Sequence, residues 1–350
     1  MKLTWTRITV HTRNPWRIAR PGSSASDFDV HRTIVSIEHD GVVGYGESAP
    51  SLYYRQTPDT VEATLAKLAP ALGDDPFALG PIVERLTHAF ADQLASVAAV
   101  DEALHDWVGR KLSVPVWRLL GLDRRATPVT SMTIGLPPDA LESPAQYLRE
   151  RVAEAHDFDI LKIKVGTPND AANLETIRAA APDAKLRLDA NCGWSAESAP
   201  RRIRELAFFG IELIEQPIPA GQIETLRSLR EESPVPIFVD EDSLRPADVM
   251  KLAGIVDGIN VKLSKCGGIR EAVRMIQIAR SAGLAIMLGC MVETSLGISA
   301  AAQIASLVDY VDLDGHLLLA DDPFTGLDVM AGRVLPPDRP GLGIDAGVVF

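Results

Sequence analysis

Charged residues recur along the middle of this chain at a nearly constant interval. The intervals are 25, 26, 25 and 25 residues, and they separate Lys164, Asp189, Glu215, Asp240 and Lys265. An interval of this size holds one strand, one helix and two connections. Eight such units close into a parallel barrel, whose functional side chains lie at the carboxyl ends of the strands. The spacing therefore predicts a barrel with one functional side chain per unit.

The sequence around these residues predicts eight strands separated by helices, which is the pattern of a (β/α)7β TIM-like barrel. Several of the strands are continuously apolar, as expected where both faces of a sheet are buried. Ser195 is expected to cap the helix after the third strand. The strands are expected near residues 128–135, 158–165, 184–190, 210–215, 235–240, 257–262, 284–290 and 309–313.

An α+β capping domain is expected ahead of the barrel. Alternating strand patterns fill the first 50 residues, and a helical pattern that starts at Asp59 or Thr60 runs to Gly121. The expected organisation is a capping domain at 1–122, a catalytic barrel at 123–330, and a segment at 331–350 that returns to the capping domain.

The composition narrows the classes of partner. The 350 residues carry a net charge of -12, which disfavours nucleic acid and anionic membranes as partners. No apolar run approaches the roughly 18 residues of a membrane helix, and the first residues lack the apolar core of a signal peptide. A cytoplasmic enzyme is therefore expected. The three cysteines, Cys192, Cys266 and Cys290, are scattered and predict neither a disulfide framework nor a structural zinc site.

The three acids of the series predict a metal site. Asp189, Glu215 and Asp240 follow consecutive strands, so their carboxylates meet at one edge of the sheet. Three neighbouring carboxylates do not remain ionised together without a counter-ion. Mg²⁺ suits a site of few carboxylates, water and substrate oxygens.

The lysines predict bases. Lys162 and Lys164 lie on the same side of one strand because side chains repeat every two residues. Like charge and partial burial are expected to depress the pKa of one of them and make it a usable base. Lys265 comes from the opposite side of the barrel and is a better candidate than Lys262. A cation that holds a substrate carboxylate between two such bases suits removal of the α-proton, and the return of a proton on the other face inverts the carbon.

Together these residues resemble the enolase superfamily, muconate-lactonizing enzyme subgroup, over nearly the whole chain. The resemblance rests on Lys162-Ile163-Lys164, Asp189-Ala190-Asn191, Glu215-Gln216-Pro217, Asp240-Glu241 and Lys265-Cys266-Gly267-Gly268. It implies Lys164 and Lys265 as the acid/base pair, with Lys162 tuning Lys164 and contacting the substrate carboxylate. It also implies Asp189, Glu215 and Asp240 as Mg²⁺ ligands, with Glu241 as the alternative to Asp240.

A further motif favours one reaction within the subgroup. Asp312-Leu313-Asp314 follows the eighth strand, and dipeptide epimerases of this subgroup, such as L-Ala-D/L-Glu epimerases, bind the substrate's α-ammonium with such a pair. The resemblance therefore implies an isomerase that epimerises the C-terminal residue of a dipeptide. An N-acylamino acid racemase, an o-succinylbenzoate synthase or a cycloisomerase on the same scaffold is the alternative. A non-catalytic barrel is a third, which five intact charges at strand ends disfavour.

Substrate specificity is expected in two capping loops, residues 16–28 and 51–54. Arg17 or Arg20 is a candidate for an acidic side chain, and Tyr54 and Glu293 are candidate pocket residues. His316 is a weaker candidate. These residues leave open whether the dipeptide is Ala-Glu-like, hydrophobic or cationic. A homo-oligomer is expected.

Overall fold

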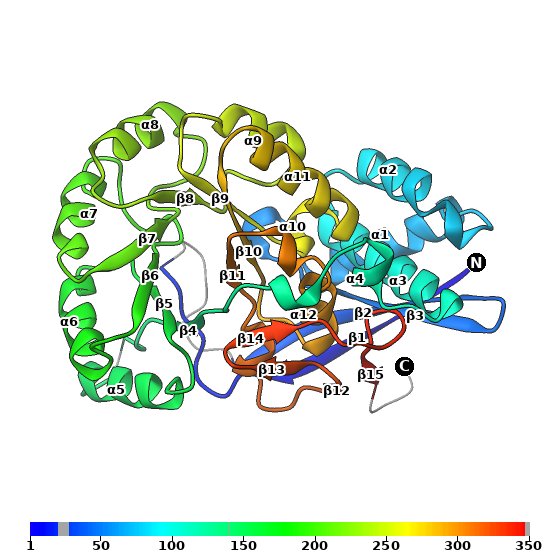
Figure 1. Ribbon diagram of the computed structural model, residues 1–350, viewed down its shortest axis with the longest axis horizontal. Helices are drawn as coiled ribbons and strands as arrows, with labels where there is room; N and C mark the ends of the chain where they lie inside the picture. Colours follow the sequence, from blue (N-terminus) through cyan, green and yellow to red (C-terminus); the bar gives the residue numbers. More distant parts are fainter. Residues whose placement is uncertain (20–27, 140, 347–350) are drawn as a thin grey trace.

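The structure is a computed structural model that describes residues 1–19, 28–139 and 141–346. These residues form two packed parts, as Figure 1 shows. The N-terminal part, in blue and cyan, lies beside a ring of strands and helices coloured from green to orange. No helix in these described ranges is both long enough and apolar enough to cross a membrane.

The N-terminal part is built on an antiparallel sheet of order β1-β2-β3, covered by a long helix. Its strands are β1 (Lys2–His11), β2 (Asp29–His39) and β3 (Val42–Ser48), and the covering helix is α3 (Leu94–Leu112). The helix lies so close to β3 that a Cβ at Gly44 would stand 2.2 Å from the carbonyl oxygen of Ala103. Glycine is therefore required here.

Two further helices, α1 (Pro58–Leu68) and α2 (Leu79–Ala89), complete this layer. The predicted start of α1 at Asp59 or Thr60 is wrong by one or two residues, because Pro58 occupies the first turn and Thr57 caps it. The Thr57 side chain accepts from the backbone N–H of Thr60 at 3.2 Å, and Thr60 Oγ1 accepts from the N–H of Thr57 at 2.9 Å. The shorter helical turns of this part and the linker are η1 (Leu52–Tyr54), η2 (Ala69–Ala71), η3 (Pro76–Ala78), α4 (Val116–Leu119) and η4 (Arg124–Ala126).

The second part is the predicted barrel. Its eight strands are parallel and follow one another in chain order around the sheet, and a bridge between Thr130 and Val311 joins the first strand's end to the last. The fold class expected from the sequence is confirmed, and each strand lies inside its predicted range. The strands are β4 (Met132–Ile134), β5 (Ile160–Lys164), β6 (Lys185–Asp189), β7 (Ile211–Glu215), β8 (Ile237–Val239), β9 (Gly258–Val261), β10 (Ala285–Gly289) and β11 (Tyr310–Asp312).

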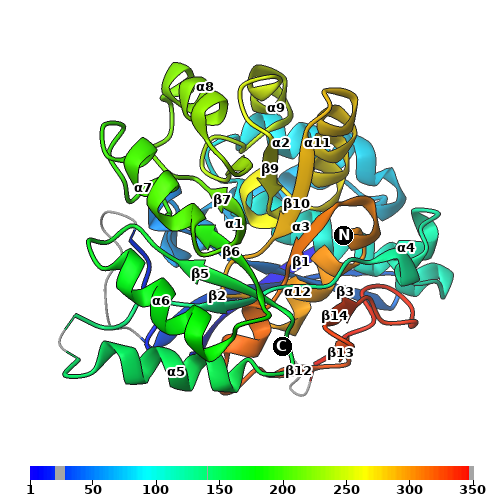
Figure 2. The same cartoon turned by 60° about the vertical axis from the view of Figure 1, so that its left-hand side comes forward.

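Helices connect these strands, and Figures 1 and 2 show α5 to α8 on the outside of the ring. The helices are α5 (Pro144–Glu154), α6 (Asp170–Ala180), α7 (Ala199–Ala207), α8 (Ile223–Glu232), α9 (Pro246–Leu252), the short α10 (Leu263–Cys266), α11 (Ile269–Ser281) and α12 (Ser295–Ala302). The prediction that Ser195 caps α7 is wrong: residues 196–198 form a turn, and α7 starts at Ala199, four residues after Ser195, with Pro200 in its first turn.

The last described residues run back to the N-terminal part. Leu342 N–H donates to Asp106 Oδ1 on α3 at 2.7 Å, and Val116 N–H donates to the carbonyl oxygen of Gly341 at 3.0 Å. The elements after β10 that complete the chain are η5 (Ala305–Leu307), η6 (Gly315–Leu318), β12 (Phe324–Thr325), β13 (Asp328–Met330), β14 (Arg333–Leu335) and β15 (Asp345–Ala346).

Candidate active site

The strand register converts the regular spacing of the charges into a row of neighbours. Lys164 is the register partner of Asp189, and Asp189 is the register partner of Glu215. Asp240 directly follows β8, the next strand in the sheet. The three carboxylates are completely buried. The structure thus brings together the three predicted metal ligands at one end of the barrel.

Two lysines face this row from β5. Lys164 Nζ donates to Asp189 Oδ2 at 2.6 Å, and Lys162 Nζ lies 3.3 Å from the same oxygen. Lys162 Nζ also lies 2.8 Å from Glu215 Oε2, although no hydrogen-bond geometry connects the two. The ammonium groups therefore act as counter-charges to the buried carboxylates.

The pKa values follow from this arrangement. Burial by itself raises the pKa of Asp189, but the charges of Lys164, Lys162 and Lys262 outweigh burial and lower it. Burial and the neighbouring Asp189 raise the pKa of Glu215. Burial lowers the pKa of Lys162, yet the surrounding carboxylates raise it well above its ordinary value. The pKa of Lys162 is thus raised, and not depressed as the like charges on one strand had predicted. Acids on other strands of the barrel raise it.

Two more lysines approach Asp240 from the side of β9 and α10. Lys262 Nζ donates to Asp240 Oδ2 at 2.9 Å. Lys265 Nζ contacts Asp240 Oδ1 and donates to the carbonyl oxygens of Asp240 at 2.7 Å and Asn260 at 3.0 Å. Lys164 and Lys265 therefore approach the carboxylate row from opposite ends.

The chemistry of the donors fits Mg²⁺. All three carboxylates are hard oxygen ligands, and Glu215 Oε2 has no hydrogen-bond donor in the described structure. Among the described residues, no three acidic, histidine or cysteine side chains are already clustered closely enough to hold a metal ion. Lys162 stands between the acids and supplies the positive charge that an ion would supply.

Asp312 and Asp314 lie on the side of Lys162 that faces away from Asp189 and Glu215. Asp312 Oδ2 accepts from Lys162 Nζ at 2.5 Å, and Asp314 Oδ2 accepts from the backbone N–H of Thr133 at 2.6 Å. Burial raises the pKa of Asp312, but Lys162 outweighs it and the pKa is lowered. Burial and then the charge of Asp312 raise the pKa of Asp314 to about 6.

The two aspartates and three of the lysines share one pocket of about 400 Å³. The pocket is lined by Lys162, Lys164, Lys262, Asp312 and Asp314, together with residues of β2 and of the capping loops. The three carboxylates of the row are not among the lining residues, and their complete burial puts them below the surface of the pocket.

Other sequence candidates lie elsewhere. Glu293 accepts from Met291 N–H at 3.1 Å and Ser264 Oγ at 3.3 Å, and it does not line the pocket. Tyr54 lines a different cavity of about 360 Å³, whereas Leu52 of the same loop does line the pocket. Arg20 lies outside the described residues.

Arg17 and His316, two weaker candidates, also lie outside the lining of the pocket. Arg17 pairs with Asp139 and donates to the carbonyl oxygen of Pro137 at 2.6 Å, away from the pocket. His316 is buried, which lowers its pKa to about 4, and it does not line the pocket either.

Sequence reasoning missed several residues that contact the site. Asn260 Nδ2 donates to Glu215 Oε1 at 2.7 Å, and the Trp16 ring lies 5.9 Å from Lys164 Nζ. Asn260 and Lys262 are two residues apart at the end of β9, so the alternation of the strand was a usable signal for both. Trp16 begins the loop 16–28 in which specificity was expected, but no sequence pattern singled it out as the residue that reaches the barrel from the capping part.

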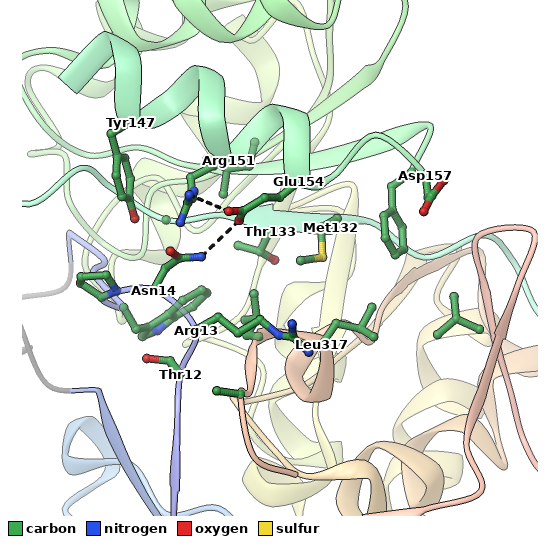
Figure 3. A pocket seen from close by; sticks show the side chains of 18 of the residues that line it. Thr12, Arg13, Asn14, Met132, Thr133, Tyr147, Arg151, Glu154, Asp157 and Leu317 are labelled. Atoms are coloured by element: carbon green, nitrogen blue, oxygen red, sulfur yellow. Dashed lines mark hydrogen bonds and ion pairs between the residues drawn. The ribbon is translucent and has the colours of Figure 1, made fainter. Parts of the chain in front are cut away.

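A larger cavity, of about 1000 Å³, lies beside this pocket (Figure 3). Asn14, Arg151 and Tyr147 line it, and both Asn14 and Arg151 contact Glu154, at 3.3 Å and 2.6 Å. Among the residues that the structure describes, no single candidate predicted from the sequence lines this larger cavity, although Trp16, the first residue of the expected specificity loop 16–28, does. We place the site in the smaller pocket, because Asp312, Asp314 and three of the four lysines line it. The fourth lysine, Lys265, lines the cavity that Tyr54 lines.

Two family models cover most of the chain. Residues 3–121 match the mandelate racemase/muconate lactonizing enzyme N-terminal domain, and residues 145–346 match the enolase C-terminal domain-like model.

Individual relatives align over nearly the full length. A hydrophobic dipeptide epimerase of Roseobacter litoralis is 39% identical, covering 98% of each chain. An L-Ala-D/L-Glu epimerase of Bacteroides thetaiotaomicron is 38% identical over 98% of this chain and 88% of its own. The dipeptide epimerase of Enterococcus faecalis V583, solved with Mg and L-Leu-L-Tyr, superposes with a TM-score of 0.88 at 35% identity, covering 98% of each chain.

Proposed function

This chain belongs to the mandelate racemase/muconate lactonizing enzyme family of the enolase superfamily, and from that premise we propose that it is a Mg²⁺-dependent dipeptide epimerase. The enzyme inverts the α-carbon of the C-terminal residue of a dipeptide and is therefore an isomerase. One observation carries the proposal: a single pocket is lined by Lys162, Lys164 and Lys262 together with the Asp312/Asp314 pair.

Lys164 and Lys265 act as the two bases. One removes the α-proton from one face of the substrate carbon, and the other returns a proton to the opposite face. Their approach from opposite ends of the carboxylate row supports this division. General acid–base catalysis by positioned side chains contributes roughly 10²–10⁴-fold each to such a step.

Asp189, Glu215 and Asp240 hold Mg²⁺. When bound, the ion supplies Lewis-acid stabilisation of the negative charge that develops on the substrate carboxylate. Lys162, placed among the same acids, is within reach of that carboxylate and adds a second positive charge. The relative from E. faecalis that binds Mg and a dipeptide supports this assignment.

Asp312 and Asp314 bind the α-ammonium of the dipeptide. Both are buried, and both line the pocket that contains the lysines. Substrates of N-acylamino acid racemases and cycloisomerases carry no ammonium group, so a buried acid pair in the pocket favours the dipeptide reaction over these alternatives.

We extend the proposal to a preference for apolar side chains. The lining of the pocket includes apolar residues of both parts, namely Ile18, Val30, Pro50, Leu52, Met291, Val292 and Leu318. Arg32 lines it too, but its guanidinium donates to the carbonyl oxygens of Val292 and His31. Of the two arginines considered for an acidic side chain, Arg17 pairs with Asp139 instead.

Proton NMR in D₂O with Mg²⁺ tests the reaction. We expect deuterium to enter the α position of the C-terminal residue of L,L-dipeptides, with the L,D epimer appearing in step. Dipeptides with apolar side chains should react faster than an Ala-Glu pair. The matched control is the double variant Asp312→Asn/Asp314→Asn.

Two outcomes would contradict the proposal. N-acyl amino acids could exchange while no dipeptide does, or the double variant could retain full activity on dipeptides. Faster turnover of the Ala-Glu pair would overturn only the side-chain preference.

Three expectations from the sequence stay proposals: the domain boundaries at residues 122 and 330, a cytoplasmic location and a homo-oligomeric state. Light scattering of the purified protein checks the oligomeric state, and a monomer would contradict it.

A further inference from the structure

A carboxylate of the capping domain caps the N-terminus of a barrel helix. Asp101 lies on α3, and its Oδ2 atom accepts from the backbone N–H of Ile269 at 2.5 Å and more weakly from that of Arg270 at 3.4 Å. These are the first two residues of α11, whose own N-cap position, Gly268, has no side chain to offer. A carboxylate is favourable here because the first N–H groups of a helix are unpaired and carry partial positive charge.

The capped helix is directly joined to Lys265. Only Cys266, Gly267 and Gly268 separate the lysine from α11, and both glycines have left-handed backbone angles, with φ of 102° and 108°. The N–H groups of both glycines donate to the carbonyl oxygen of Leu263 at 3.0 Å. The short helix α10 and the start of α11 therefore form one tight, hydrogen-bonded turn that contains both Lys265 and Ile269.

Asp101 packs closely against Gly268 of this turn. Asp101 is completely buried, and a Cβ at Gly268 would lie 2.3 Å from its Oδ2 atom. His105, one turn later on α3, donates from Nδ1 to the carbonyl oxygen of Asp101 at 2.8 Å and lies 3.4 Å from Oδ2. The carboxylate thus has little room to move relative to Gly268.

We propose that Asp101 is a positioning residue for Lys265: through the N-terminus of α11, the capping domain sets the place of one of the two bases. The inference rests on the proposed function. It assigns Asp101 no contact with substrate, metal or the reacting proton.

The other base is not linked to the capping domain through a capped helix: its contact with that domain is the Trp16 ring, 5.9 Å from Lys164 Nζ. Lys164 ends β5 and is held by its register partner Asp189 within the barrel sheet. Loss of the Asp101 cap should therefore slow proton transfer at one face of the substrate carbon more than at the other. A purely structural role would slow both faces alike.

The test is the rate of α-proton exchange in D₂O, measured separately from the L,L and the L,D dipeptide. Lys164→Ala and Lys265→Ala first identify which epimer each lysine deprotonates. Asp101→Ala should then slow exchange of the epimer served by Lys265 on the order of tenfold, because displacements of about 1 Å cost up to 10²-fold in rate. Exchange of the other epimer should change less than about twofold by the same reasoning.

Three further variants make the result decisive. Asp101→Asn keeps one acceptor for Ile269 and should show the same one-sided effect, more weakly, even where Asp101→Ala does not fold. Gly268→Ala places a methyl group against the Asp101 carboxylate from the barrel side. It should also slow exchange of the epimer served by Lys265 more than that of the other epimer. Asp106→Asn is the matched control: Asp106 lies on the same helix, is equally buried, and accepts instead from Leu342 N–H at 2.7 Å and Tyr45 N–H at 2.9 Å.

Equal slowing of both epimers in Asp101→Asn, as expected for Asp106→Asn, would overturn the inference and leave the proposed function standing. Failure of the unaltered enzyme to exchange any dipeptide would instead overturn the proposed function.

Discussion

At the scale of single residues, Lys162 contacts acids on both sides of the site. Its Nζ atom lies within 3.3 Å of oxygens of Asp189, Glu215 and Asp312. Each of these acids is buried, so each depends on a nearby positive charge for its ionised form. Lys162 thus balances the metal side and the ammonium side of the pocket at once.

Replacement of Lys162 by Met should destabilise the protein and make its stability depend on Mg²⁺. Removing one partner of a buried ion pair costs about 3–5 kcal/mol because the remaining charge is uncompensated. Added Mg²⁺ should recover more of the free energy of unfolding in this variant than in the unaltered protein, as urea titrations with and without the ion can measure. Lys251→Met, at a lysine whose side chain is 70% exposed, is the control and should change little.

Asp314 should make dipeptide turnover sensitive to acid. Its pKa is raised to about 6 by burial and by Asp312, so it loses its charge as the pH falls through that value. The substrate ammonium keeps its charge there. The value of kcat/KM, which reports ionisations of the free enzyme, should therefore decline below about pH 6. Asp314→Asn should remove this limb of the profile; a limb that persists unchanged would assign it to another group.

At the scale of elements, the loops after β7 and β8 are tied together by Gln216. Its Oε1 atom accepts from the backbone N–H groups of Asp240 at 2.9 Å and Glu241 at 3.0 Å, and its Nε2 atom donates to Asp242 Oδ2 at 2.8 Å. Gln216 is completely buried and has a left-handed φ of 38°. One side chain thus fixes the backbone that carries Asp240 to the end of the neighbouring strand.

Gln216→Ala should weaken Mg²⁺ binding. Residues that hold a metal ligand in place typically contribute 10–100-fold to metal affinity, so a loss of roughly tenfold is expected. Calorimetric titration of the metal-free protein measures it without reference to turnover. Gln146→Ala, which removes an exposed contact to Glu150 on α5, is the matched control. Equal affinities in the two variants would show that Gln216 does not hold the ligand.

The sequence predicted the elements and strand-end residues well because both depend on local patterns. Apolar strands at regular spacing fix a barrel, and a charged residue at a strand's carboxyl end has only one edge of the sheet to occupy. Glu293 and Tyr54 were poorer candidates because a strand or loop pattern does not give the direction of a side chain: Glu293 turns to Met291 and Ser264, and Tyr54 lines a different cavity. The pKa of Lys162 could not be read from its strand, because the acids that raise it come from three other strands.

At the scale of the whole molecule, acids of the N-terminal part reach into the barrel at two helix starts. Glu47 accepts from the backbone N–H groups of Thr294 and Gly297 at 3.1 Å each, at the beginning of α12. Asp101 does the same at α11. The two parts are thus joined by buried carboxyl groups as well as by apolar packing.

Glu47 should make stability fall as the pH rises through the neutral range. Burial, and then the charge of Glu293, raise the pKa of Glu47 from 4.5 to about 8, while Arg32 opposes the shift. Between these values the folded state holds a proton that the unfolded state has released, so the free energy of unfolding declines with pH. The slope from this group is at most about 1.4 kcal/mol per pH unit.

Glu47→Gln removes that titration while keeping the shape of the side chain. Glu102 and Glu293, whose pKa values are also raised mainly by burial, remain in the variant and preserve part of the slope. Urea unfolding at pH 5, 6.5 and 8 should therefore show a shallower decline for Glu47→Gln. A slope identical to that of the unaltered protein would refute the assignment.

The hydrogen bonds between the two parts also set an order of events during synthesis. Each acid is translated long before the residue that donates to it. Ile269 follows Asp101 by 168 positions, Thr294 follows Glu47 by 247, and Leu342 follows Asp106 by 236. A nascent chain carries these acids without their partners until the ribosome has passed most of the barrel. Contacts this distant in sequence slow folding, since a long loop has to close before they form. Catalytic competence is therefore acquired late, when the last barrel helices dock onto a domain that was translated first.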